Sequence, residues 1–254
     1  MKLRIHGCGT SSGVPRIGND WGTCDPHDPR NRRLRASILV EHEGLRILVD
    51  TGPDMREQLL AAKAGAVDAV LWTHDHADHC HGIDDLRQIY HARRAAVPGF
   101  ARPDTLETLR RRFGYAFEGK GDYPPVVDGQ ALPDAFEAGG IAVRVVDQPH
   151  GAIISAGIRF DANRKSIGYS TDFNRLTDEM IALFKGIDVW VVDALRRLPH
   201  PTHPHLDQAL EWIGRVQPKR AILTHMDNSM DYARLVAELP DGVEPGYDGL
   251  EVIV

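Results

Sequence analysis

Three histidines and two aspartates fall within seven consecutive residues, Thr73-His74-Asp75-His76-Ala77-Asp78-His79. The preceding residues, Ala69-Val70-Leu71-Trp72, form an apolar run that predicts a buried strand. The cluster therefore lies where a strand ends and a loop begins, a common position for catalytic groups. Imidazoles and carboxylates are ligands for zinc, manganese or iron. The alternative is a polar loop that happens to be rich in histidine, and so dense a cluster of candidate ligands argues against it.

The spacing within the cluster suggests two metal positions. His74 and His76 are two residues apart, so in extended backbone their side chains point the same way and can share one metal. Asp78 and His79 follow after the chain turns, and they could face a second metal beside the first.

The composition is that of a globular protein with an ordinary core. Of 254 residues, 42% are hydrophobic and 26% are charged, and the net charge is -6. The acidic balance argues against a general nucleic-acid binder, so nucleic acid is not the expected partner. Three cysteines far apart imply no disulfide framework and fit a reducing cytoplasm. We find no signal peptide and no run of membrane length, so we expect a cytoplasmic enzyme without membrane contact, which could form a homodimer.

Hydrophobic periodicity predicts two β-rich halves in which helices come mainly late. We expect strands at 3–5, 37–41, 46–50, 67–73, 141–146, 153–160, 165–170, 187–192, 220–223 and 250–254, and helices at 53–64, 83–90, 103–113, 176–185, 206–216 and 232–239. Residues 114–138 show little periodicity and suggest an irregular segment that could cover the site. No disordered linker separates the halves, so we treat 1–254 as a single domain of two packed sheets under helical layers.

Later strands also end in candidate ligands, at His150, Asp172 and His225. An isolated histidine is more often structural, but the ordered series H-x-H-x-D-H, then His, Asp and His, resembles the metallo-β-lactamase superfamily. The resemblance implies an α+β fold, the αββα sandwich, with two divalent metal ions (zinc or manganese, with iron as a further option) at one edge. It assigns the first metal to His74, His76 and His150, the second to Asp78, His79 and His225, and the bridging position to Asp172.

Flanking segments narrow the branch of the superfamily. Gly7–Pro15, Arg35-Ala36-Ser37 and Thr224-His225-Met226 resemble the 5-phosphoribosyl 1,2-cyclic phosphate phosphodiesterase branch, which is related to tRNase Z. This likeness implies a dinuclear metal-dependent hydrolase of a small phosphorylated substrate, such as a cyclic phosphodiester or a nucleotide. A hydroxide held between the two metals would attack phosphorus, and Asp78 would help to orient it.

Both related families carry a further histidine that assists the scissile phosphate or the leaving group. The corresponding region, Pro199 to Leu210, contains three histidines. His203 matches the family position best, His205 is the nearby competitor and a candidate substrate contact, and His200 is third. The alternative is that these residues only shape a loop and that Thr202 or Asp207 caps the following helix.

Candidates for holding the substrate phosphate lie in the first 35 residues. Ser11 and Ser12 belong to a loop rich in glycine and serine, although most such runs are simple turns. The arginines between Arg30 and Arg35 could form an anion-attracting lip, with Arg35 beside the site, or belong to a solvated loop; the sequence favours neither. Asp50, after a predicted strand, could cap a turn or orient a metal-bound histidine.

The sequence is also compatible with two other functions and with one structural metal site. A thioester hydrolase of the glyoxalase II kind shares the ligand set but usually has a C-terminal helical domain that is not seen here. A non-catalytic nucleic-acid or protein-binding module on this fold usually loses ligands, whereas all seven are present. Cys24 with His27 could contribute to a structural zinc site, but a single cysteine in this region favours a free buried thiol.

Overall fold

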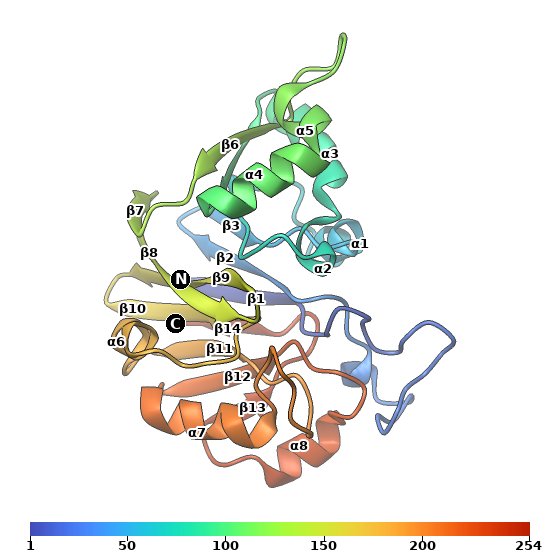
Figure 1. Ribbon diagram of the computed structural model, residues 1–254, viewed down its shortest axis with the longest axis vertical. Helices are drawn as coiled ribbons and strands as arrows, with labels where there is room; N and C mark the ends of the chain where they lie inside the picture. Colours follow the sequence, from blue (N-terminus) through green and yellow to red (C-terminus); the bar gives the residue numbers. More distant parts are fainter.

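The chain forms two sheets packed face to face, with helices on both outer surfaces (Figure 1). The structure, a computed structural model, describes residues 1–254. The first sheet has the order β14 (Glu251–Ile253), β1 (Lys2–Gly7), β2 (Ser37–His42), β3 (Leu45–Val49), β4 (Ala69–Leu71), β5 (Val97–Ala101) and β6 (Val127–Ala131). The second has the order β13 (Val243–Pro245), β12 (Arg220–Thr224), β11 (Val189–Asp193), β10 (Lys165–Ser170), β9 (Ile153–Ala162), β8 (Ile141–His150) and β7 (Ala135–Ala138).

Each sheet carries its own helices. The helices on the first sheet are α1 (Met55–Ala61), α2 (Ala77–Cys80), α3 (Leu86–Arg93), α4 (Pro103–Arg112) and α5 (Gly114–Glu118). Those on the second sheet are α6 (Asp178–Phe184), α7 (Leu206–Val216) and α8 (Tyr232–Glu238), and short 3₁₀ turns form η1 (Pro29–Asn31) and η2 (Ile83–Asp85). This confirms the predicted αββα sandwich. No helix is both long enough and apolar enough to cross a membrane.

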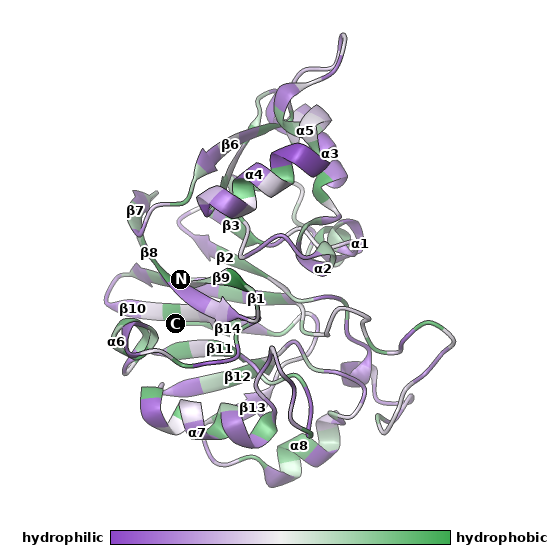
Figure 2. Ribbon diagram, in the orientation of Figure 1, coloured by the Kyte–Doolittle hydropathy of each residue, from purple (hydrophilic) through white to green (hydrophobic).

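Strand alternation explains why the two sheets pack. In β2, Ile38 and Val40 point into the large core between the sheets, whereas Leu39 points into a smaller core under the helices. Both faces of such a strand are buried, so its sequence is a continuous apolar run rather than an alternating one. Figure 2 shows this pattern as green strands in the middle of the molecule and purple outer turns on α3 to α5 and α7.

Strand direction brings the ends of four strands to one edge of the second sheet. β8 and β10 are both antiparallel to β9, and β11 and β12 run parallel to β10. These four strands therefore run the same way, and their C-terminal ends lie together. From the first sheet, β4 delivers Thr73, whose carbonyl accepts the N–H of Ala156 at 2.9 Å. The edges of the two sheets thus meet at the residues that follow β4.

The prediction of an irregular segment over the site at 114–138 is wrong. This segment forms α5 and the edge strands β6 and β7, and none of its residues lines the cavity at the metal ligands. Only Val127 of β6 is buried, so the strand has no hydrophobic period to detect. Its partner β5 was also missed, because Gly99 interrupts the pattern: a Cβ there would lie 2.6 Å from Cζ3 of Trp72.

Candidate metal centre

All seven predicted ligands lie together where the two sheets meet. His74 and His76 follow β4, and α2 supplies Asp78 and His79. The other three, His150, Asp172 and His225, come from the aligned ends of β8, β10 and β12. Six of the seven are buried, and His76 is the exposed one. Residues from distant parts of the chain therefore form one cluster of imidazoles and carboxylates.

Asp172 divides this cluster into two groups. Its Oδ1 lies 3.7 Å from Nε2 of His74 and 3.6 Å from Nε2 of His150. Nε2 of His150 is in turn 3.3 Å from Nδ1 of His76. These four residues form one potential metal-binding group.

The other carboxylate oxygen of Asp172 faces the second group. Its Oδ2 lies 3.2 Å from Nε2 of His79 and 3.4 Å from Nε2 of His225. Oδ2 of Asp78 is 3.3 Å from His79 Nε2 and 3.4 Å from His225 Nε2. One carboxylate thus contributes one oxygen to each half of the cluster.

The donor atoms fit divalent metal ions. In a tetrahedral site with bonds of about 2.0–2.1 Å, neighbouring donor atoms are roughly 3.3 Å apart, which is close to the separations within both groups. Nε2 of His74 and Nε2 of His79 are buried and have no hydrogen-bond partner. Buried polar atoms without partners are rare and costly in folded proteins, and a bound cation would satisfy both.

The reverse sides of the ligands are held by hydrogen bonds. Nδ1 of His79 lies 2.7 Å from Oδ2 of Asp50, and Oγ1 of Thr73 joins Nδ1 of His74 (3.0 Å) to Asp50 (2.8 Å). Nδ1 of His150 donates to the carbonyl of Thr202 at 3.0 Å. A histidine with its Nδ1–H donated in this way presents Nε2 to a metal. The alternative in which Asp50 orients a metal-binding histidine is therefore the one that the geometry supports.

Two aspartates and one histidine of the site adopt the left-handed backbone conformation. Asp50, Asp172 and His225 have φ values of 65°, 55° and 58°. This conformation is uncommon for residues with a side chain, and such residues gather at sites where the surrounding structure enforces them. Here it turns the chain sharply at the ends of β3, β10 and β12, so that the side chains face the cluster.

Burial and mutual charge set the protonation states without any ion. Burial favours neutral carboxyl groups, but the surrounding imidazoles outweigh it and hold the pKa of Asp172 and of Asp78 below the usual range. Burial also disfavours imidazolium, yet Asp172 raises the pKa of His225 to about 9. His74 is different, because burial and the neighbouring His79 lower its pKa. The centre is therefore built around carboxylates that favour positive charge beside them.

His203 lies beside the ligands and is oriented by a carboxylate. Its Nδ1 is 2.8 Å from Oδ2 of Asp193, and its Nε2 is 3.8 Å from Oδ1 of Asp172. Asp193 also accepts the backbone N–H of Asp172 at 3.0 Å. Asp193 directly follows the predicted strand at 187–192 and is not among the predicted site residues, although Asp50 and Asp172 also follow strand ends.

His205 and His200, the other two candidates between Pro199 and Leu210, lie outside the cavity lining. His205 sits at the N-terminus of α7, and it is absent from the lining of the cavity of about 260 Å³ over the ligands. The ring of His200 is 5.1 Å from that of His203, and its Nδ1 contacts Thr202 rather than a ligand. Of the three histidines, only His203 lines the cavity.

The candidate phosphate-binding residues near the N-terminus also differ in whether they line the cavity. Ser11 lines the cavity, whereas the neighbouring Ser12 is exposed outside the lining. Arg35 forms an ion pair of 2.8 Å with Asp54, and its Nε donates to the carbonyl of Ser11 at 3.3 Å. Arg35 therefore supports the loop that carries Ser11.

The arginine cluster does not form a common lip. Arg30 pairs with Asp28 and stacks on Tyr232, whereas Arg33 is fully buried and donates to the carbonyl of Met230 at 2.6 Å. The alternatives of an anion-attracting lip and a solvated loop are thus both wrong for Arg33, which is a structural residue. Cys24 is a buried free thiol near the guanidinium of Arg33.

Comparisons with known proteins identify the family and the fold. Residues 45–226 match the beta-lactamase superfamily domain. A crystal structure of a new diphosphatase from the PhnP family superposes with a TM-score of 0.91 at 35% identity, covering 99% of this chain and 96% of that one.

Curated relatives include proteins with different names. An octanoyltransferase of Porphyromonas gingivalis is 34% identical over 261 residues, which cover all of this chain and 52% of the relative. A ribonuclease Z of Bradyrhizobium is 36% identical over 126 residues, which cover 46% of this chain and 42% of the relative. The chain therefore spans about half the length of the curated relatives it matches.

Proposed function

Because this chain belongs to the beta-lactamase superfamily, we propose that it hydrolyses a small phosphodiester with two divalent metal ions held at Asp172. The superfamily match and the His/Asp cluster establish a metal-binding hydrolase fold. The finer proposal is the number of ions, the phosphodiester substrate and the roles of individual residues. Zinc or manganese, with iron as a further option, suits these imidazole and carboxylate ligands.

The observation that carries the proposal is that the two carboxylate oxygens of Asp172 face different pairs of histidines. Its Oδ1 faces His74 and His150, while its Oδ2 faces His79 and His225. A carboxylate whose two oxygens serve separate imidazole groups is suited to bridging two ions, whereas a mononuclear site needs only one of those groups.

Divalent ions held by Asp172 and the surrounding histidines would supply an activated hydroxide at neutral pH and would neutralise charge on the phosphoryl oxygens. His203 then serves the leaving oxygen: its Nδ1–H is donated to Asp193, so a proton on Nε2 can pass to the oxygen as the P–O bond breaks. The Asp193 carboxylate holds the ring in this orientation during the transfer. Asp78 and Ser11 line the same cavity and can orient the nucleophile and the phosphate.

The size of the cavity and the relatives both support a small phosphorylated substrate. The cavity is about 260 Å³, just below the range of roughly 300–1,000 Å³ that is usual for ligand pockets. The PhnP-family neighbour is described as a diphosphatase, and the Bradyrhizobium relative as a ribonuclease Z. Both names involve phosphoryl chemistry. The octanoyltransferase match leaves 48% of that relative unaligned, so its activity can reside outside the shared region.

A direct comparison of substrates tests the proposal. The metal-loaded protein, with Mn²⁺ or Zn²⁺, is assayed with bis(p-nitrophenyl) phosphate, with a glutathione thioester and with an octanoyl thioester. We expect turnover of the phosphodiester that is lost in Asp172→Ala and retained in Asp241→Ala, which changes an exposed aspartate. Turnover of the glutathione thioester alone would favour the glyoxalase II alternative, and no turnover of any substrate would favour the non-catalytic module.

A further inference from the structure

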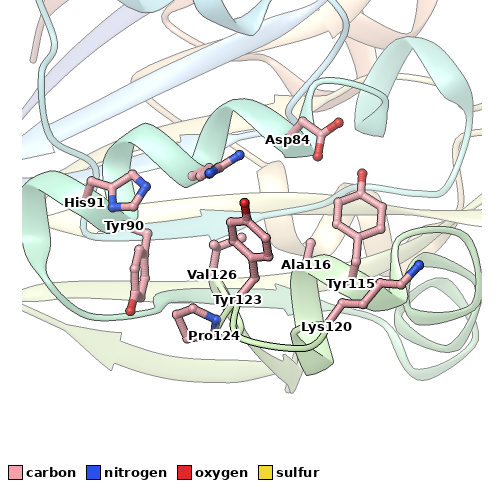
Figure 3. A pocket seen from close by; sticks show the side chains of 10 residues that line it. Asp84, Tyr90, His91, Tyr115, Ala116, Lys120, Tyr123, Pro124 and Val126 are labelled. Carbon is pink, nitrogen blue, oxygen red and sulfur yellow. The ribbon is translucent and has the colours of Figure 1, made fainter.

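A second cavity lies away from the metal centre, between α3 and the segment that joins α5 to β6 (Figure 3). Its volume is about 280 Å³. None of its lining residues lines the cavity over the metal ligands. It is therefore a separate pocket for which the hydrolytic function gives no explanation.

Aromatic rings form the walls of this pocket. Tyr90 comes from α3, and Tyr115 and Tyr123 come from the opposite side; Ala116 and Val126 lie between them (Figure 3). Tyr115 is 44% exposed and Tyr123 is 65% exposed. Large aromatic surfaces are costly to leave in water, and they provide flat faces on which another ring system can stack.

Basic side chains also line the pocket. Arg87, Lys120 and His91 all contribute to the lining, and no ion pair in the structure involves any of them. The guanidinium of Arg87 instead lies over the Tyr123 ring, 5.1 Å from its centroid. A planar guanidinium stacked on an aromatic ring keeps its N–H groups free for an anion at the edge of the stack.

The lining holds a single carboxylate, Asp84, which faces the hydroxyl of Tyr115 (Figure 3). Burial and the neighbouring Asp84 raise the pKa of Tyr115 to about 12. Arg87 and Lys120 outnumber this carboxylate, so the lining is net positive, although the whole chain carries a net charge of -6. This local reversal of sign is suited to an anionic ligand.

The segment that carries Tyr123 has a defined backbone. The N–H of Lys120 donates to the carbonyl of Tyr123 at 2.9 Å, and the N–H of Tyr123 donates back at 3.1 Å. Gly119 permits this turn, since a Cβ there would lie 2.4 Å from the same Tyr123 carbonyl. The N–H of Val126 also donates to the carbonyl of Ala116 at 2.8 Å. The pocket is thus formed by a hydrogen-bonded turn packed beside a helix.

We infer that this pocket binds a nucleotide, with the base stacked against Tyr123 and the phosphate held by Arg87. Its volume suits one flat ring system and is too small for a folded peptide segment. A free mononucleotide and the terminal nucleotide of a single strand share this chemistry. The inference does not depend on the hydrolytic reaction, because it uses no residue of the metal centre.

Binding to the intact metal-loaded protein tests the inference by calorimetry with AMP as the probe. Adenosine lacks the phosphate and ribose 5-phosphate lacks the base, so both should bind about tenfold more weakly or worse. Tyr123→Ala and Arg87→Gln should each weaken AMP binding by about tenfold or more, because base stacking and phosphate contact each contribute on that scale. Tyr123→Phe keeps the ring and should retain affinity within about twofold.

A variant of the metal centre separates this inference from the proposed function. His76→Ala should lose phosphodiester turnover yet keep the Tyr123-dependent binding of AMP. A 5′-phosphorylated hexanucleotide that binds more tightly than AMP, and still requires Tyr123, identifies a strand end as the ligand; equal affinity identifies the free nucleotide. Unchanged AMP affinity in Tyr123→Ala and Arg87→Gln would overturn the inference, as would ribose 5-phosphate or a glutamate-rich peptide binding as tightly as AMP.

Discussion

Oδ2 of Asp193 lies 2.8 Å from Nδ1 of His203, in a buried pair at the edge of the metal centre. The carboxylate fixes the ring so that Nε2 faces the cavity, where a proton could reach a leaving oxygen. Removal of His203 should therefore matter most when the leaving group is poor. His203→Ala should lower kcat for 2′,3′-cyclic AMP, which has an alkoxide leaving group, by about 10²- to 10⁴-fold.

The leaving group also provides the control. Because p-nitrophenolate leaves without help, His203→Ala should lower kcat for bis(p-nitrophenyl) phosphate much less. His205→Ala should leave both rates within a few-fold of wild type, since His205 is outside the cavity lining. Equal losses for the two substrates in His203→Ala, or a large loss in His205→Ala, would reject His203 as the proton donor.

The metal content of the purified protein should be two ions per chain, and Asp172→Ala should reduce it to one or none. The reason is that Asp172 contributes an oxygen to both groups of histidines, so both positions lose a ligand. Elemental analysis after dialysis measures the ratio, with Asp241→Ala as the matched exposed control. A wild-type ratio of one that Asp172→Ala does not change would contradict the dinuclear proposal.

Asp50 should control metal affinity without touching the ion. It holds Nδ1 of His79 at 2.7 Å and, through Thr73, also supports His74. Asp50→Asn preserves the shape but weakens these contacts, and we expect the affinity for Zn²⁺ to fall by about 10- to 100-fold. Competition with a fluorescent chelator measures this change. If the chelator competition is unaltered, Asp50 is only a structural residue of the turn.

The site was easier to predict from sequence than the elements around it. The ligands His150, Asp172 and His225 all follow apolar strands, and their ordered series distinguishes them from structural histidines. Strand direction then brings them together, which no local pattern encodes. The roles of Asp193 and Thr202 depend on contacts across 10 and 52 residues, so no local spacing identifies their partners.

Two features explain the predictions that were wrong: edge strands without hydrophobic periodicity, and an arginine that is buried rather than exposed. β6 pairs with β5 through backbone hydrogen bonds, and a strand with a single buried side chain shows no periodicity. Arg33 appeared as one more cation in a basic run, yet it is 1% exposed while Arg32 is at the surface. Which of several adjacent arginines becomes buried is decided by the carbonyls that the fold places opposite it.

Arg33 should consequently be a stability determinant. Its guanidinium donates to the carbonyls of Met230 (2.6 Å) and Asp227 (3.3 Å), and so joins the N-terminal loop to the segment before α8. Arg33→Met leaves these buried acceptors without a donor and should lower the free energy of unfolding by about 3 kcal/mol. Arg32→Met should change it by less than about 0.5 kcal/mol. Urea denaturation of both variants measures the difference; equal effects would show that the buried contacts of Arg33 are not special.

His6 should make stability depend on pH independently of the metal centre. The ring is 3% exposed, and neither nitrogen has a hydrogen-bond partner. Burial, assisted by Arg4 and opposed by Glu41, lowers its pKa from 6.5 to about 4. Between these values the unfolded chain binds the proton and the folded chain does not. Stability from this residue is therefore complete above pH 6.5 and is lost as the pH falls toward 4.

The loss attributable to His6 between pH 7.5 and pH 5 should be about 2 kcal/mol. Urea denaturation at both pH values, with EDTA present so that metal release does not contribute, measures it in wild type and in His6→Leu. Leucine cannot bind a proton, so the variant should lose less stability over this interval by that amount, because the carboxylates common to both proteins cancel in the comparison. An identical pH dependence in the two proteins would mean that water or a nearby group solvates the His6 ring when it becomes charged.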